Sequence, residues 1–94
     1  MNKIKKATIS HIHYLDTIRQ LESMKENVKV SDISDMLGLP RPSVTKTIKD
    51  MENLGFVKKM TTKEDGRVVY IQITDSGKAC HELFLPYSRH PLLF

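Results

Sequence analysis

The chain has 94 residues, which is enough for one small domain with a single hydrophobic core. Apolar residues make up 39% of it and charged residues 28%, the balance of an ordinary soluble globular protein. The longest apolar run, VVYIQI, is far too short to span a membrane. The basic residues 1–6 are not followed by the apolar block of a signal peptide, and one cysteine excludes an internal disulfide. We therefore expect a cytoplasmic protein with no membrane association.

The net charge of +4 is unevenly distributed along the chain. Residues 1–6 carry +3, residues 7–40 carry −2, residues 41–67 carry +3, and residues 68–94 are neutral overall. Basic residues concentrated in this way favour a polyanionic partner, with nucleic acid as the leading candidate. The alternative is that a modest net charge only keeps the protein soluble.

Residues 8–26 are predicted to form a long first helix, because apolar side chains recur at every third position. Thr8 or Ser10 is suited to cap its start, and Asn27 to end it. Residues 28–30 alternate apolar and polar side chains, which predicts a very short strand. The apolar stripe consists of Ile9, Ile12, Leu15, Ile18 and Leu21, widened by Tyr14 and Met24.

Residues 31–55 have the pattern of two short helices joined by a tight turn. Ser31 is the predicted N-cap of the first, and Asp32 suits the positive end of its dipole. Gly38 can adopt the left-handed conformation that ends this helix, and Leu39 is expected to fold back onto its apolar stripe. That stripe consists of Ile33, Met36 and Leu37.

The second of these helices is predicted to have one buried and one polar face. Because Pro40 stands where a Ser or Thr cap is expected, first-turn amides lack an internal acceptor, which a DNA phosphate, Ser43 or water would supply. Hydrogen-bond donors face outward, as in a helix-turn-helix whose second helix enters a major groove. The apolar face consists of Val44, Ile48, Met51 and Leu54, and the polar face of Ser43, Thr45, Lys46 and Lys49.

Residues 56–74 predict a β-hairpin. Two extended segments flank an Asp65-Gly66 pair, the strongest short-range hairpin signal. Residues 75–85 then predict a C-terminal helix that Pro86 stops, and residues 86–94 form a tail. The fold class is therefore mainly α with a small antiparallel β-hairpin, a single winged helix-turn-helix domain spanning residues 1–94.

Candidate DNA-binding residues fall into two groups. Ser43, Thr45, Lys46 and Lys49 are placed to read base edges. Phosphate contacts, which add affinity and salt dependence but no sequence information, are expected from Arg41, Lys58, Lys59 and Lys63. For each lysine the alternative is a solvated surface charge.

The segments LGLPRPSVTKTIKDMENLGFVKK and KEDGRVVYIQITDSGK resemble the MarR family of bacterial transcription regulators. The resemblance covers residues 10–85 and implies a homodimer on a pseudo-palindromic operator. It also implies that the wing arginine, here Arg67, enters the minor groove while Asp65 orients the wing. Residues 43–55 resemble the metal-dependent DtxR-type repressors too, but the wing of those proteins lacks the Asp-x-Arg pattern.

The family resemblance also implies a small-molecule effector, or oxidation, that relieves DNA binding. MarR-like chains usually continue into long C-terminal helices, whereas this chain ends at Phe94 and has Pro86 and Pro91 after the last predicted helix. We expect it to dimerise through the first helix and the apolar tail, or to act as a monomeric accessory binder.

Other functions have less support in the sequence. No metal site, cofactor or enzyme activity is expected, because metal-ligand spacings, phosphate loops and paired catalytic carboxylates are missing. Cys80 is interpreted as a small buried hydrophobe, with redox sensing as the alternative. The remaining rivals are a protein-interaction module and a metal-responsive repressor. Ligands for a metal would come from His11, His13, Cys80, His81 and His90.

Overall fold

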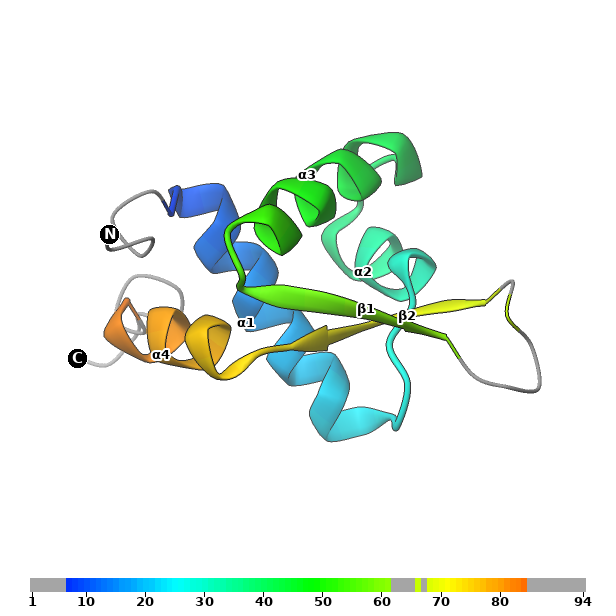
Figure 1. Ribbon diagram of the computed structural model, residues 1–94. Helices are drawn as coiled ribbons and strands as arrows, with labels where there is room; N and C mark the ends of the chain where they lie inside the picture. The colour runs from blue at the N-terminus through cyan, green and yellow to red at the C-terminus, as the bar shows by residue number, and fades with distance from the viewer. Residues whose placement is uncertain (1–6, 62–65, 67, 85–94) are drawn as a thin grey trace.

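The computed structural model describes residues 7–61, 66 and 68–84. Four helices and one two-stranded antiparallel sheet form the fold, which confirms the predicted mainly α chain with a small hairpin (Figure 1). Helices α2 and α3 lie on one side of the hairpin, and α4 continues from β2 against α1. In chain order the elements are α1 (Ile9–Met24), α2 (Val30–Leu37), α3 (Arg41–Asn53), β1 (Val57–Thr61), β2 (Val69–Ile73) and α4 (Asp75–Leu83).

Helix α1 begins with a reciprocal cap. The Thr8 hydroxyl accepts from the backbone N–H of His11 (3.1 Å), and His11 Nδ1 accepts from the backbone N–H of Thr8 (3.2 Å). This is a capping box with histidine in place of the usual Glu or Gln, and it satisfies two amides that the helix leaves free. Beyond it, Leu15 and Ile18 are completely buried.

One core joins all the elements. Residues from α1, α2, α3 and the hairpin meet in it, and those of α3 have the spacing that the sequence predicts. Such a core supplies most of the folding free energy, about 1.5–3 kcal/mol for each fully buried aliphatic side chain. Its largest fully buried members include Phe56, Leu15, Ile18, Ile33, Ile48, Met51, Val28 and Val44.

Helix α2 starts two residues earlier than predicted. Its N-cap is Lys29, not Ser31, because the Asp32 carboxylate reaches back to accept the Lys29 N–H at 2.8 Å. The same carboxylate oxygen accepts from Lys25 Nζ at 2.8 Å, and these contacts lower the pKa of Asp32 against the effect of desolvation. The predicted strand at residues 28–30 is also wrong as a strand: only Val28 pairs, in an isolated bridge to Ile71.

The turn between α2 and α3 is fixed by Ser34. Gly38 is left-handed (φ 68°), as predicted, and the amides of Gly38 and Leu39 both donate to the Ser34 carbonyl. The buried Ser34 hydroxyl donates to the Leu39 carbonyl. Two predicted apolar contacts are wrong, since Leu39 is 40% and Met36 42% exposed.

Helical geometry explains the exposure of Met36. At about 100° per residue, Ile33, Ser34 and Leu37 share one face of α2, and Met36 falls beside it. The Leu39 backbone, rather than its side chain, is what holds the turn to α2.

Hydrogen bonds also hold the junction between α3, the hairpin and α4. Gly55 is left-handed (φ 84°), and the amides of Gly55 and Phe56 donate to the carbonyls of Glu52 and Met51, which is a Schellman motif. Thr74 sits against this motif: its N–H donates to the Phe56 carbonyl and its hydroxyl to the Gly55 carbonyl. The same hydroxyl accepts the N–H of Gly77 and so caps α4.

Polar side chains lie buried between α1 and α4. His81 Nε2 is 2.9 Å from Asp16 Oδ1, and Gln20 donates to the other Asp16 oxygen at 2.6 Å. Arg19 forms an ion pair with Glu82 at 3.2 Å at the rim. Among the described residues, no helix is long and apolar enough to cross a membrane.

Candidate nucleic-acid interface

Helix α3 carries five of the predicted DNA-binding residues, Arg41 at its first position and four on its outer side. All five are exposed, while the opposite face is closed by Val44, Ile48 and Met51, each 0% exposed. At about 100° per residue, Lys46 lies in the middle of the outer face. The five exposed residues, called here the α3 face, are Arg41, Ser43, Thr45, Lys46 and Lys49.

The cations of the α3 face are not paired with any acid that the structure describes. Within the part of the chain that the structure describes, no ion pair involves Arg41, Lys46 or Lys49. On the same helix, the acid Glu52 is engaged elsewhere, because it contacts Lys59 at 3.5 Å. The charge on this face is therefore available to an external anion.

The start of α3 adds to the same potential. Its N-cap is Pro40, which has no side-chain acceptor, and Pro42 follows within the first turn. The positive end of the helix dipole and the free first-turn amides then favour an anion next to Arg41. That a phosphate, rather than Ser43 or water, completes the cap stays a prediction.

The hairpin lysines differ from each other. Lys58 is exposed, as a phosphate contact requires. Lys59 is also predicted to contact a phosphate, but it forms an ion pair with Glu52. A surface pair of this kind contributes only about 0–1 kcal/mol, so a phosphate can compete for Lys59.

Residues 62–65 and 67 of the hairpin tip lie outside the described residues, and with them Lys63, Asp65 and Arg67. The strands on either side are described. They extend past the helices, and their outer ends at Thr61 and Val69 lie toward the same end of the molecule as the start of α3 (Figure 1).

The possible metal ligands that the structure describes form no cluster. Among the described residues, no group of three or more His, Cys, Asp or Glu side chains is placed to hold a metal ion. His11 is occupied by its cap and His81 by Asp16, His13 is exposed, and His90 lies outside the described part. Burial of Cys80 raises the pKa of its thiol, which leaves less reactive thiolate and favours the structural interpretation of this residue.

Two residues that support the α3 face were not singled out from the sequence. Ser34 holds the turn before α3, and Thr74 holds the end of α3 through Gly55. Ser34 carried no signal, since a serine inside a short helix is usually a surface residue. Thr74 carried a weak signal: it stands three residues before Gly77, which is the distance at which an N-cap side chain accepts a backbone amide.

Comparison with known proteins adds independent information. Residues 7–69 match the model of the MarR family. An uncharacterized HTH-type transcriptional regulator of Bacillus subtilis, YfiV, is 37% identical over 51 residues, which cover 54% of this chain and 32% of YfiV.

Solved structures share the fold. Streptococcus pneumoniae FabT in complex with DNA has a TM-score of 0.74 and 25% identity, covering 88% of this chain and 55% of FabT. The S. aureus MepR–DNA complex has a TM-score of 0.75 and 20% identity, covering 87% of this chain and 57% of MepR. This chain thus spans about a third of the curated relative and just over half of these two structures.

Proposed function

This chain belongs to the MarR family, and on that premise we propose that it is a DNA-binding transcription regulator that recognises a specific operator. The observation that carries the proposal is the α3 face, where exposed donors, and cations with no ion pair among the described residues, accompany a fully buried apolar face. The fold shared with the FabT–DNA and MepR–DNA complexes supports it.

In this proposal α3 lies in the major groove. Lys46 and Lys49 donate to guanine O6 and N7, and Ser43 and Thr45 bond to whichever base edge faces them. Arg41 and the first turn of α3 bind a backbone phosphate, which fixes the register of the helix on the duplex.

The hairpin supplies the flanking contacts. By resemblance to the family, Arg67 enters the minor groove, Asp65 orients the wing, and Lys63 contacts a phosphate. The described strands support this assignment because β1 ends, and β2 begins, toward the end of the molecule where α3 begins.

We further propose a homodimer that acts in the cytoplasm under the control of a small-molecule effector. One module of this size buries little surface against DNA, and two copies on a pseudo-palindrome remedy this. Their α3 helices would then lie about one helical turn apart, ~34 Å.

Titration of a fluorescent duplex from the protein's own upstream region, at several salt concentrations, tests the proposal. The logarithm of the binding constant is expected to fall linearly with the logarithm of salt concentration. Lys46→Ala is expected to cost ~1–3 kcal/mol if it reads a base, and to reduce the salt slope by ~1 if it contacts a phosphate.

Lys78→Ala is the matched control, because Lys78 is an exposed lysine on α4 outside the α3 face. Equal losses from the two substitutions would contradict the assignment of α3. Weak, salt-insensitive binding by the unmodified protein would overturn the DNA proposal and support a protein-interaction module instead.

A further inference from the structure

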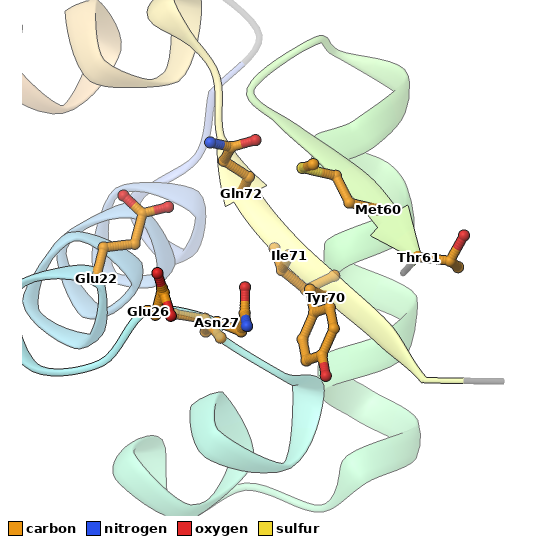
Figure 2. A pocket seen from close by; sticks show the side chains of 9 residues that line it. Glu22, Glu26, Asn27, Met60, Thr61, Tyr70, Ile71 and Gln72 are labelled. Carbon is orange, nitrogen blue, oxygen red and sulfur yellow. The ribbon is translucent and has the colours of Figure 1, made fainter. Parts of the chain in front are cut away.

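A cavity of about 240 Å³ lies between the end of α1 and the hairpin (Figure 2), and no residue of the α3 face lines it. Glu22, Glu26 and Asn27 line it from α1 and the loop that follows, and Tyr70 and Gln72 line it from β2. The complete lining of this hairpin cavity is Glu22, Glu26, Asn27, Val28, Met60, Thr61, Tyr70, Ile71 and Gln72.

The two walls of the cavity are fixed to each other. The Ile71 N–H donates to the Val28 carbonyl at 2.7 Å, and the Ile73 N–H donates to Glu22 Oε2 at 3.1 Å. Val28 and Ile71 are also 1% and 2% exposed, so the floor is part of the core. The cavity is therefore formed before any ligand arrives, which lowers the entropy lost on binding.

The charge of the lining is one-sided. Two of the nine side chains are carboxylates and none is Lys, Arg or His, in a protein whose net charge is +4. Neither Glu26 nor the second oxygen of Glu22 has a hydrogen-bond or ion-pair partner among the described residues. The neighbouring Lys25 is held by Asp32 instead.

We propose that the hairpin cavity binds a small organic ammonium compound with an apolar or aromatic body. The ammonium group contacts Glu22 and Glu26, and the body lies on the Tyr70 ring and the Met60 thioether, which favour cations and polarizable groups. Anions are repelled by the carboxylates. The described residues bring no third metal ligand to the site, so a bare metal ion is a poorer match.

The size of the cavity agrees with this class of ligand. Its volume lies just below the ~300–1,000 Å³ of pockets for drug-sized molecules, so it suits a compound with one ring. Such a compound would contact the α1–α2 loop and both strands of the hairpin at once, and would connect a metabolite signal to the wing.

Three probes with one carbon skeleton isolate the charge: 2-phenylethylammonium, neutral 2-phenylethanol and anionic phenylacetate. Titrating each into isotope-labelled protein, followed by backbone amide NMR shifts, measures binding without DNA. The result therefore does not depend on the proposed DNA-binding function. The ammonium is expected to bind with a Kd in about the millimolar range or below, as its size allows. Shifts should concentrate at residues 22–28 and 70–72.

Variants locate the site. Glu26→Gln removes an exposed charge that has no partner among the described residues, and it is expected to weaken ammonium binding about tenfold, the size of a charge-assisted hydrogen bond. Glu22→Gln keeps an oxygen for the Ile73 N–H and should weaken binding similarly. Asp35→Asn, an equal change in charge on the exposed side of α2, should have no effect.

Equal binding of the three probes would overturn the proposal. So would shifts that centre outside the cavity, or an Asp35→Asn variant that loses as much affinity as Glu26→Gln.

Discussion

The α3 face and the boundary between α1 and α4 both carry charged side chains, but they use them in opposite ways. On α3, Arg41, Lys46 and Lys49 are exposed and have no ion-pair partner within the described residues. At the boundary, Asp16 and His81 are 8% and 2% exposed and lie 2.9 Å apart. No buried side-chain nitrogen or oxygen in the described part lacks a hydrogen bond.

The difference follows from solvation. Water stabilises an exposed cation, so the fold does not depend on it and a ligand can use it. A buried polar group has lost water and needs a protein partner, so its removal affects the fold directly. Substitutions at the boundary between α1 and α4 should therefore change stability, and substitutions on the α3 face should change binding. The variants below test how far these two effects are independent.

The largest effect is expected from Asp16→Ala. The substitution leaves the buried His81 ring nitrogen and the Gln20 amide without an acceptor, and we expect a loss of about 3 kcal/mol in the free energy of unfolding. Urea unfolding followed by circular dichroism measures it. Asp35→Ala, at an exposed position on α2, should stay within about 0.5 kcal/mol. Similar losses in both variants would remove the distinction between the two regions.

Gly77→Ala is expected to cause the second-largest loss of stability, because the added methyl group pushes α4 away from the rest of the fold. A Cβ at this position would lie 2.2 Å from the Phe56 carbonyl oxygen and 2.8 Å from Ile73 Cγ1, so the helix must shift. We expect a destabilisation of about 2 kcal/mol, the usual cost of overpacking. Thermal unfolding checks it against Ser76→Ala, an exposed neighbour that should change little.

A smaller effect is expected from pH, through His11. Burial lowers the pKa of His11, and the negative charge of Asp50 acts in the opposite direction. Because the folded pKa is below the unfolded value of 6.5, the neutral ring contributes stability above about pH 6.5 that is lost as the pH falls below it. Protonation also removes the Nδ1 acceptor of the Thr8 cap.

Unfolding free energies measured between pH 8 and pH 5 should show this decrease. His11→Gln preserves a capping box and cannot titrate, so its stability should depend less on pH in the acidic range. An unchanged pH profile in His11→Gln would assign the dependence to other groups.

The smallest effect on stability is expected from the double substitution Lys46→Ala and Lys49→Ala. The free energy of unfolding should change by no more than about 0.5 kcal/mol, since both side chains are solvated and alanine favours helix. DNA affinity should fall markedly in the same variant. A large loss of stability would mean that these lysines support the fold, contrary to the comparison above.

Features that depend on residues close together in the chain, such as a buried helix face or a helix end, can be predicted from this sequence. The spacing of Val44, Ile48 and Met51 predicted the buried face of α3, and Gly38 and Gly55 are both left-handed at helix ends. Such signals depend on helix geometry and backbone sterics, which act between near neighbours in the chain.

The remaining features depend on partners that are distant in the sequence. Asp16 and His81 are 65 residues apart, and the contact between Glu22 and the Ile73 amide spans 51 residues. The spacing of apolar residues indicates which side chains are buried, but it does not indicate which residues they contact. The start of α2 was misplaced for a different reason: Ser31 is a good N-cap by type, but Asp32 satisfies the Lys29 amide directly.

The hydrogen bonds of Thr74 have a mechanical consequence. Because its amide and hydroxyl are bonded to Phe56 and Gly55 while its hydroxyl also caps α4, the last turn of α3 and the first turn of α4 share one rigid pivot. We therefore expect a tilt of α4 to move the end of α3 as well, because these hydrogen bonds join the two helix ends. Any event that repositions α4 would reach the proposed DNA-reading side chains across a single residue.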